Sequence, residues 1–402
     1  MDVDILVAGA GPAGSAFAAF LAQTGLSVTV VDRTGFPRDK ACSEYMSPET
    51  VRVLSRLGVV EALERAGAAA PRGTAVTAAR GARLHGVFER AGRPPFRPTG
   101  LAVSRRVLDN ELVVAARRLG AQVLERTTVE ELLYDEGAVA GALVRDALGH
   151  RRGIRARLTV GADGLRSVVA RRIGHRSHGF PRRVAFVAHM AGVRDTGAYA
   201  ELHVRSAGYV GINPIGQDLT NVALVVPAHS AGPARGRVKQ FFSEMLTEFP
   251  PVAGRLADAE IVRPILTTGP FAAWSGRVIA PGAALVGDAA DFFDPFTGEG
   301  IYSALRGAEL LAETAIDALN IPGQLTVDRL TPYRRSRRRV FGGKWLVERM
   351  IGYGMTFPAL FDRAVARLGR RGRMAHTLIG VTGDFVPARE VLNPIYLARM
   401  IV

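Results

Sequence analysis

A glycine-rich turn near the start of the chain has the residue types and spacing that bind a dinucleotide. The apolar run Val3 to Ala8 predicts a strand and leads into the turn Gly9-Ala10-Gly11-Pro12-Ala13-Gly14. Gly9 permits the tight turn, Gly11 lets the backbone approach a pyrophosphate, and Gly14 lets the next helix pack closely on the strand. The amides at the start of that helix can then bind phosphate.

A second predicted strand, Val28 to Val31, ends at Asp32 and Arg33. A carboxylate at this position can accept hydrogen bonds from ribose hydroxyls. The glycine spacing alone also occurs in ordinary structural turns, which are the alternative interpretation. The order of strand, turn, helix-forming run Ser15 to Ala22 and buried strand favours a dinucleotide site in a parallel α/β lobe.

Two further apolar strands end on carboxylates that can reach the same sheet edge. Leu158 to Ala162 runs into Asp163, and Ala283 to Val286 leads to Asp288. Ligands of open α/β sheets bind outside the carboxyl ends of the strands, where a carboxylate can accept a hydrogen bond from a polyol hydroxyl. These positions therefore extend the predicted cofactor site.

A loop rich in glycine precedes a long predicted helix, Gly300 to Ala318. Within it, Pro295 and Gly298 come just before Gly300 and Ile301. Amides at a helix N-terminus can stabilise negative charge on a reduced flavin ring. The alternative interpretation is that this loop only caps the helix and contacts no cofactor.

The composition is that of a globular protein with more than one lobe. The chain has 402 residues, of which 48% are hydrophobic and 22% charged. The uncharged stretch Ile5 to Thr24 lacks a basic leader and contains the glycine turn, so we interpret it neither as a signal peptide nor as a membrane span. The single cysteine, Cys42, excludes an intramolecular disulfide and a cysteine-based zinc site. We expect a cytoplasmic protein, with a peripheral membrane position as an option.

The net charge of +15 is concentrated near the C-terminus. Residues 331–402 hold thirteen Arg and one Lys against two Asp and two Glu, a balance of +10. No nucleic-acid reader motif accompanies this charge, so we expect no nucleic-acid partner. The remaining candidate partners are an anionic membrane surface, an acidic carrier protein and an anionic substrate. The alternative is a solvated Arg-rich helix that binds no partner.

The order of predicted elements indicates an α/β fold, α+β overall, with a discontinuous Rossmann-like lobe. We predict a cofactor lobe over residues 1–75, 101–180 and 277–330, and a substrate lobe over residues 76–100 and 181–276. Successive alternating strands between residues 184 and 226 predict that the substrate lobe is an antiparallel sheet with one buried face. Residues 331–402 form a basic, mostly helical C-terminal segment.

At these motifs the chain resembles the flavoprotein superfamily of p-hydroxybenzoate hydroxylase-type monooxygenases, flavin-dependent halogenases and geranylgeranyl reductases. The run Phe36-Pro37-Arg38-Asp39-Lys40-Ala41-Cys42-Ser43-Glu44 is similar to the reductases' FPRxKxCGE loop, with Ser43 in place of Gly. Pro295 to Ile301 is similar to their PxTGEGI. The resemblance implies FAD as the cofactor. It also implies flavin or adenine contacts at Lys40, Cys42, Ser43, Arg105 and Val129.

The chain departs from this family in the substrate sheet. The reductases carry YxWxFPK, whereas this chain reads Tyr209-Val210-Gly211-Ile212-Asn213-Pro214-Ile215. The missing Trp, Phe and Lys imply a differently shaped pocket and weaken the case for a prenyl substrate. Halogenases need a lysine near the ring, and none occurs between residues 41 and 238.

We therefore expect an FAD-dependent oxidoreductase acting on a largely apolar small molecule, by hydride transfer to a C=C bond. A monooxygenase that works through a flavin hydroperoxide is the alternative, and a halogenase or a non-catalytic flavin-bound interaction protein is less favoured. Cys42, Glu44 and Tyr209 are the catalytic candidates. NAD(P)H binding transiently, or an external reductant, would supply electrons, because no second glycine-rich dinucleotide turn is visible.

Overall fold

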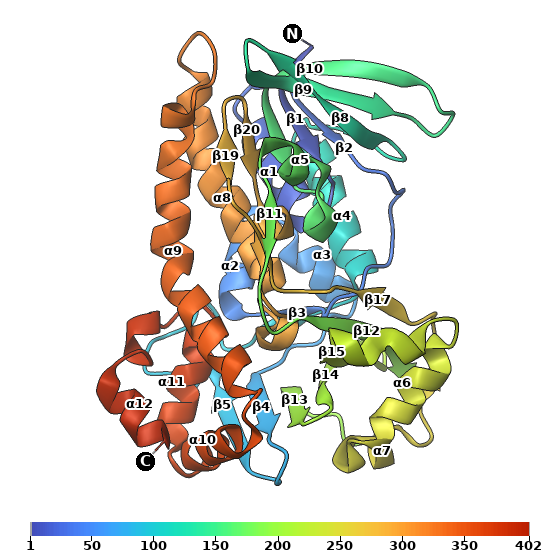
Figure 1. Ribbon diagram of the computed structural model, residues 1–402, viewed down its shortest axis with the longest axis vertical. Helices are drawn as coiled ribbons and strands as arrows, with labels where there is room; N and C mark the ends of the chain where they lie inside the picture. The colour runs from blue at the N-terminus through green and yellow to red at the C-terminus, as the bar shows by residue number, and fades with distance from the viewer. Residues whose placement is uncertain (1, 402) are drawn as a thin grey trace.

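The protein consists of two lobes, each built on one large sheet, and the computed structural model describes residues 2–401 (Figure 1). The sheet of the first lobe has the order β19-β20-β10-β1-β2-β7. Its strands are β1 (Val3–Ala8), β2 (Val28–Val31), β7 (Gln122–Leu124), β10 (Arg151–Gly161), β19 (Ile279–Ala280) and β20 (Ala283–Leu285). All of these pairings are parallel except β19 with β20.

Helices and a hairpin cover the two faces of this sheet. On one face lie α1 (Pro12–Ala22), α2 (Pro48–Arg56), α3 (Val60–Arg65), α4 (Arg105–Arg118) and α8 (Gly300–Leu319). The other face packs against α5 (Val168–Ile173) and the hairpin of β8 (Thr128–Asp135) and β9 (Ala138–Arg145). Because both faces are buried, Ile5 to Ala8 of β1 is a continuous apolar run, and β2 is apolar apart from Thr29.

The second sheet has the order β16-β12-β15-β14-β13-β4-β5, with β17 also paired to β12. Its strands are β4 (Gly73–Thr77), β5 (Arg83–Val87), β12 (Arg183–Ala191), β13 (Ala200–Arg205), β14 (Gly208–Gly216), β15 (Leu219–Pro227), β16 (Glu260–Ile261) and β17 (Leu266–Thr268). Its pairings are antiparallel apart from β13 with β4.

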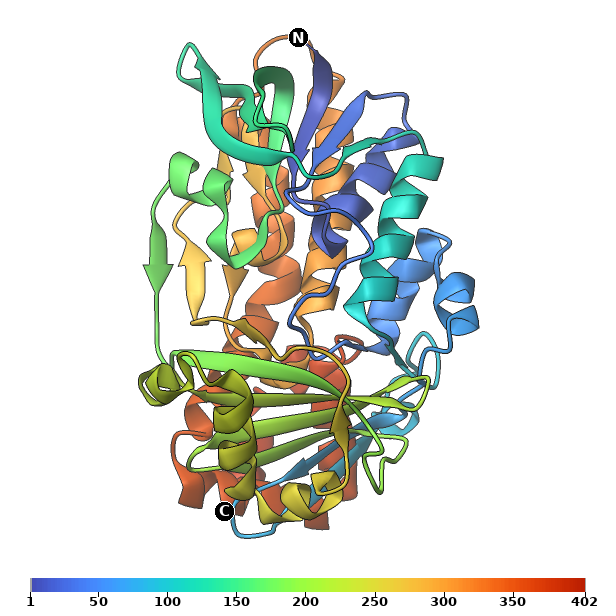
Figure 2. The same cartoon turned by 90° about the vertical axis from the view of Figure 1, so that its right-hand side faces the viewer.

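Both faces of the second sheet are covered. Helices α6 (Val238–Thr247) and α7 (Pro250–Leu256) cross the outer face, which Figure 2 shows beneath the first lobe. The opposite face packs Val187 and Val225 against Phe292 and Phe296 of the first lobe and Met355 of the C-terminal segment. The expectation of a single buried face is therefore wrong, because segments distant in sequence cover the second one.

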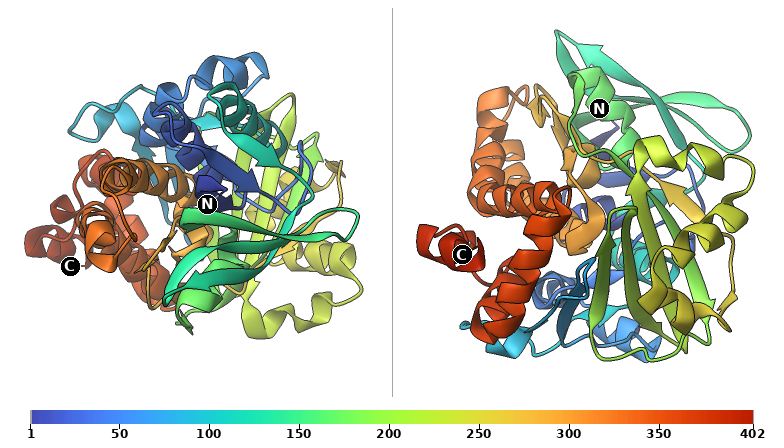
Figure 3. Two further views of the ribbon diagram at one scale, coloured as in Figure 1. Left: turned by 90° about the horizontal axis from the view of Figure 1, so that it is seen from above. Right: turned by 60° about the horizontal axis from the view of Figure 1, so that its bottom comes forward.

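The C-terminal segment is helical and lies along one side of the molecule (Figure 3). It comprises α9 (Val327–Gly354), α10 (Pro358–Arg370), α11 (Gly372–Thr382) and α12 (Pro394–Ile401). Helix α11 packs on β5, where a Cβ on Gly86 would lie 2.0 Å from Ile379 Cγ1. No helix within residues 2–401 combines the length and the apolar character that crossing a bilayer requires.

The predicted fold class is confirmed, and most differences from the sequence expectations are local. β8 was not predicted, and the expected lobe boundary between residues 75 and 76 falls inside β4. Short strands connect the lobes: β3 (Tyr45–Met46) pairs with β6 (Leu101–Ala102), and β18 (Ala273–Ser275) pairs with β11 (Arg176–His178) and β21 (Asp291–Phe292).

The packing of α6 on the second sheet gives a stability prediction. Phe242 is fully buried among apolar side chains of this sheet, so Phe242→Ala should lower the free energy of unfolding by about 3–5 kcal/mol. Denaturant unfolding measures this loss. Phe96 is half exposed, and Phe96→Ala should change the same quantity by less than about 0.5 kcal/mol. Equal losses in the two variants would contradict the assigned packing.

Candidate active site

The glycine turn between β1 and α1 leaves space at one of its three glycines. Gly9 has φ +99°, and a Cβ on it would lie 2.6 Å from Ala162 O. A Cβ on Gly14 would lie only 1.8 Å from Gly9 O. At Gly11 the nearest neighbour would be Arg38 Nη2 at 3.5 Å. Two glycines thus serve close packing, while Gly11 has room in front of it for a group that approaches the backbone.

Helix α1 begins at this opening with unpaired amides. Its N-cap, Gly11, offers no side-chain hydrogen bond, Pro12 occupies the first position, and no acidic residue lies in the first turn. Pro12, Ala13 and Gly14 are buried. The helix dipole and the Arg38 guanidinium both favour an anion at this point.

Asp32 is held at the end of β2 by the turn itself. Its Oδ2 accepts from Ala10 N at 2.8 Å, and its Oδ1 accepts from Thr34 N and Thr34 Oγ1 at 2.9 and 2.7 Å. These bonds fix the carboxylate and leave lone pairs for ribose hydroxyls. Arg33 is exposed. Val129 lies in β8 opposite Val144, directly before a bulge.

The two predicted strand-end carboxylates lie at the carboxyl edge of the sheet. Asp163 Oδ2 accepts from Val168 N at 2.7 Å, whereas Asp163 Oδ1 is buried without a partner among residues 2–401. Burial raises the pKa of Asp163. A buried polar atom without a partner is costly, and here a ligand hydroxyl could supply the missing hydrogen bond.

Lys40 reaches from the loop of residues 36–44 to this edge. A Cβ on Gly164 would lie 3.7 Å from Lys40 Nζ. Burial lowers the pKa of Lys40, and the charge of Arg105 lowers it further. Burial raises the pKa of Asp288, and the charges of Lys40 and Arg105 oppose that rise. The site therefore combines cationic and acidic groups in one partly buried place.

Arg105 is fixed at the start of α4. Its Nε and Nη2 donate to the two oxygens of buried Asp109 at 2.6 and 2.8 Å. Arg38 Nη1 also lies 3.1 Å from Asp109 Oδ2. This carboxylate holds both guanidinium groups beside the turn, which makes Arg38 a site residue that the sequence interpretation did not select.

Glu44 ties the loop to both lobes. Its Oε1 accepts from Arg105 N at 2.9 Å, and its Oε2 lies 2.6 Å from His189 Nε2 and accepts from Asn221 Nδ2 at 2.9 Å. The side chain is 1% exposed, and the backbone has φ +59°. With both oxygens engaged, Glu44 has the geometry of an anchor for the loop.

Two asparagines of the second sheet hold the backbone next to Glu44. Asn221 Nδ2 donates to Cys42 O at 2.8 Å, and Asn213 Nδ2 donates to Ser43 O at 3.1 Å. Cys42 Sγ accepts from Glu44 N at 3.3 Å and also lies beside the Arg105 side chain. The sequence interpretation missed both amides. Their signal was two asparagines, rare in strands, on neighbouring strands, and they stand opposite each other in the register.

Tyr209 belongs to a second buried polar group. Its hydroxyl donates to Asp294 Oδ1 at 2.5 Å, and Arg183 Nη1 donates to Asp294 Oδ2 at 2.7 Å. Burial, with the negative charge of Asp294, raises the pKa of Tyr209 well above its usual value. Tyr209 thus carries its proton at neutral pH. It faces the same apolar layer as Val187 and Val225.

The loop before α8 presents a second helix N-terminus. Pro295 follows Asp294, Gly298 has φ +73°, and a Cβ on Gly298 would lie 2.7 Å from Tyr45 Cδ1. Glu299 is the N-cap of α8 and offers no side-chain cap, so the amides of Gly300 and Ile301 face outward from the helix end. This is the arrangement that can stabilise negative charge on a ring.

Glu299 is buried and joined to the C-terminal segment, which the sequence did not indicate. Ser47 Oγ donates to Glu299 Oε2 at 3.2 Å, and Lys344 Nζ of α9 lies 4.0 Å from that oxygen. Lys344 also bonds Asp384. Burial raises the pKa of Glu299 well above its usual value, and Lys344 opposes the rise.

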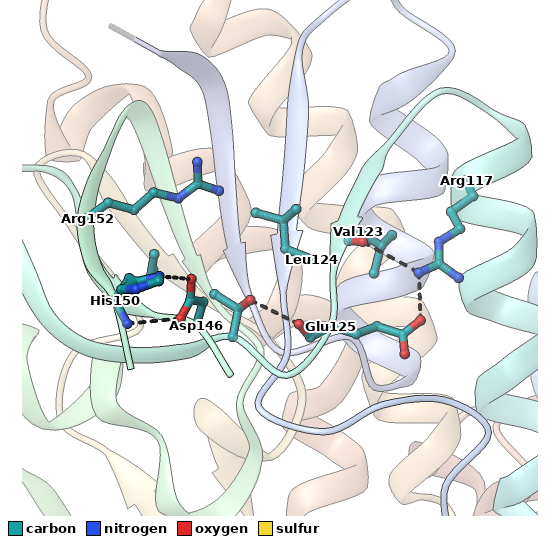
Figure 4. Close-up of a pocket in the computed structure, with 9 residues that line it drawn as sticks. Arg117, Val123, Leu124, Glu125, Asp146, His150 and Arg152 are labelled. Atoms are coloured by element: carbon teal, nitrogen blue, oxygen red, sulfur yellow. Dashed lines mark hydrogen bonds and ion pairs between the residues drawn. The ribbon is translucent and has the colours of Figure 1, made fainter. Parts of the chain in front are cut away.

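A separate open cavity lies at the edge of β7 and the β9–β10 turn (Figure 4). Arg117 donates to Glu125 Oε1 at 2.6 Å on one side, and His150 lies beside Asp146 on the other. Its lining includes none of the residues that the sequence predicts for the site. Most of the predicted residues instead lie at the turns after β1, β2, β10 and β20, in the loop of residues 36–44 and at the N-termini of α4 and α8. Val129 lies in β8, Tyr209 lies in β14 and Arg33 is exposed.

A family model for an FAD binding domain matches residues 2–343. The chain belongs to this family. A menaquinone reductase of Mycolicibacterium smegmatis is 32% identical over 77% of this chain and 75% of its own length. A digeranylgeranylglycerophospholipid reductase of Methanosarcina mazei is 29% identical over 98% of this chain and 93% of its own.

Solved structures share the fold. A geranylgeranyl bacteriochlorophyll reductase-like protein of Thermoplasma acidophilum has a TM-score of 0.80 at 22% identity, covering 99% of this chain and 98% of its own. A flavin-dependent brominase has a TM-score of 0.82 at 21% identity, covering 98% of each chain. With the family match, these findings make the chain an FAD-dependent oxidoreductase.

The residues present fit FAD on three observations. Gly11 has room beside an uncapped helix end, Asp163 Oδ1 is a buried acceptor without a partner among residues 2–401, and α8 begins without a side-chain cap. Gly11, Asp32 and Arg38 would hold the dinucleotide part. Asp163, Asp288 and the amides of Gly300 and Ile301 would hold the flavin part.

Filling the space at Gly11 tests this assignment. Gly11→Leu should lower FAD affinity by about a hundredfold or more, about 3 kcal/mol, because the side chain would occupy the place of the pyrophosphate. Flavin titration of refolded or stripped protein measures the affinity. Gly254→Leu is the matched control, since Gly254 also has open space in front of its Cα but lies in α7, outside the site. Unchanged FAD affinity in Gly11→Leu would refute the assignment.

The acidic groups around Lys344 give a pH prediction. Burial raises the pKa of Glu348 to about 7, Lys344 opposes this rise, and Asp384, Asp291 and Asp294 add to it. Between the ordinary pKa and about 7 the folded protein keeps a proton that the unfolded chain releases, so the free energy of unfolding falls as pH rises through this window.

Glu348→Gln should remove that fall. When the pH is raised from about 5 to about 8, the free energy of unfolding of the unmodified protein should fall by about 2 kcal/mol relative to that of the variant. This difference is smaller than the full pKa shift implies, because Glu348 is partly exposed. Guanidinium unfolding at the two pH values measures the difference. Glu390→Gln, at an exposed position of the same segment, should show no such difference. A pH dependence that persists in Glu348→Gln would contradict the assignment.

Proposed function

We propose that the chain reduces a carbon–carbon double bond of a largely apolar small molecule. The observation that carries this proposal is the apolar layer between the second sheet and the loop before α8. It is formed by Ala185, Val187, Leu202, Val204, Ala223, Val225, Phe271, Phe292, Phe296 and Met355. A hydrocarbon bound beside such a layer would meet apolar side chains and little water.

Two further observations support a reductase. The loop of residues 36–44 and the run Pro295 to Ile301 resemble reductase motifs. The names of the relatives from Mycolicibacterium smegmatis and Methanosarcina mazei also describe reductases. The altered segment from Tyr209 to Ile215 argues that the substrate differs in shape from that of the prenyl reductases.

The chain's own residues would divide the work as follows. Bound reduced FAD supplies the hydride that adds to one alkene carbon. Tyr209 would supply the proton for the other carbon, because its hydroxyl is a proton-bearing group on the apolar face. For this the hydroxyl would turn from Asp294 toward the substrate, and solvent would return a proton to it after each turnover. Asp294 and Arg183 hold that hydroxyl in place. Glu44, through His189 and Asn221, holds the loop of residues 36–44.

Product mass tests the reaction. The FAD-loaded protein, reduced anaerobically with NADH, NADPH or dithionite in separate arms, is mixed with a series of detergent-dispersed isoprenoid and quinone alkenes. A product that has gained two hydrogens supports the proposal, and the arms show whether a nicotinamide suffices as reductant. Conversion that requires air and adds one oxygen atom would reject the reductase in favour of a monooxygenase.

Removing the proton donor should slow the reaction without removing the flavin. Tyr209→Phe should lower kcat by about a hundredfold, the usual contribution of a general acid, while FAD content and the rate of flavin reduction stay unchanged. Tyr134→Phe is the control, because Tyr134 is exposed and bonds only Arg172 O. A Tyr209→Phe enzyme with unchanged kcat at every pH would exclude Tyr209 as the donor.

A further inference from the structure

An exposed apolar turn joins α9 to α10. Phe357, Pro358, Ala359 and Leu360 are consecutive exposed residues, and Phe357 is 62% exposed. Phe180, from the segment before β12, is also 62% exposed and stacks on Tyr353 at 6.4 Å between ring centroids. Leu346, Tyr353, Phe357 and Leu360 with Phe180 are called the apolar patch below. Contiguous exposed aromatic and aliphatic side chains of this kind mark an interaction surface.

Arginines accompany the apolar patch on both helices. Arg349 lies three residues after Leu346 and four before Tyr353, so it shares their face of α9. Arg363 lies three residues after Leu360 on α10 and shares its face in the same way. Arg80 N donates to Asp362 Oδ1 at 2.8 Å, which brings the exposed Arg80 beside α10. The patch therefore has a cationic border.

Within residues 2–401, no ion pair neutralises these arginines. The ion pairs that residues 331–401 make within the described chain join Arg337 to Asp291, Lys344 to Glu299 and Asp384, and Arg389 to Glu390. Arg349 and Arg363 are in none of them and are exposed. Apolar side chains flanked by unpaired cations are complementary to an anionic lipid surface, which takes both into its interfacial region.

The patch is continuous with the proposed active site. Tyr353 contacts Phe293 at 6.1 Å between ring centroids, and a Cβ on Gly352 would lie 2.6 Å from the Phe293 ring. Met355, in the turn itself, packs in the apolar layer that faces the second sheet. A series of packed aromatic and aliphatic side chains thus connects the exposed turn with the loop before α8.

We propose that the apolar patch and its arginines dock the protein on an anionic lipid surface, and that a lipid-dissolved substrate enters from there. The entry route rests on the proposed function, whereas the docking does not. An acidic protein partner is a different occupant. Lipid is favoured because the patch is apolar at its centre, with charge confined to its border.

Vesicle flotation tests the docking without turnover. FAD-loaded full-length protein is mixed with vesicles of phosphatidylcholine alone or with phosphatidylglycerol added, at low and high salt. We expect flotation with the anionic vesicles and a loss of about tenfold or more at high salt. Absence of flotation with anionic vesicles would overturn the proposal and leave an acidic protein as the remaining candidate.

Paired variants show whether vesicle binding depends on the apolar patch and its arginines or on the net positive charge of the whole protein. Phe357→Ala with Leu360→Ala, and Arg349→Gln with Arg363→Gln, should each lower vesicle binding by about tenfold or more. The controls are Leu148→Ala at a distant exposed leucine and Arg334→Gln with Arg338→Gln on the N-terminal half of α9. They should change binding by less than about twofold. Equal losses in patch and control variants would overturn the proposal.

The readouts keep docking and reaction apart. All variants alter exposed positions, and FAD content with the unfolding midpoint shows that they fold. The rate of anaerobic flavin reduction by dithionite should be unchanged in the patch variants, since it requires neither vesicle nor alkene. Loss of flotation with normal flavin reduction supports docking, whereas normal flotation in a chain that reduces no alkene would reject only the proposed function and its entry route.

Discussion

One buried carboxylate connects the two sheets. Glu44 accepts from the first helical amide of α4 in the FAD lobe and bonds His189 and Asn221 of the second sheet. Burying a carboxylate costs free energy that hydrogen bonds must offset, and a non-glycine residue at φ +59° adds a further cost. Glu44 is kept at this position despite its burial and its positive φ because its hydrogen bonds fix where the loop of residues 36–44 lies.

The position of that loop determines the electrostatics of the cofactor site. With Cys42 and Ser43 held by Asn221 and Asn213, the preceding residues must cross the carboxyl edge of the first sheet. Lys40 is thereby brought to Gly164 and Arg38 to Gly11. Substitutions in the second sheet that release the loop should therefore reach the flavin site, although they lie on another lobe.

The sequence revealed those features that are local along the chain. The bounds of β1 and β2 and the glycine turn follow from largely apolar runs and steric needs within a few residues. The partners of Glu44 lie 61, 145 and 177 residues away, and such pairings depend on the tertiary fold. For the same reason the sequence predicts Glu44 and Cys42 as catalytic candidates without indicating the bonds that hold them, and it does not indicate Arg38, Asn213 or Asn221.

The summed charge of the C-terminal segment does not show which of its cations are buried and which are exposed. As a sum, the tail is a basic segment, but two of its cations are buried and hold the FAD lobe. Arg337 bonds Asp291 and lies over the rings of Phe341 and Trp345, and Lys344 lies between Glu299 and Asp384. Arg349, on the same helix, and Arg363, on α10, are exposed and have no such pair within residues 2–401. The buried cations of this segment thus stabilise the loop before α8, while its exposed arginines face the solvent. A movement of α9 on binding to a lipid surface would therefore displace that loop.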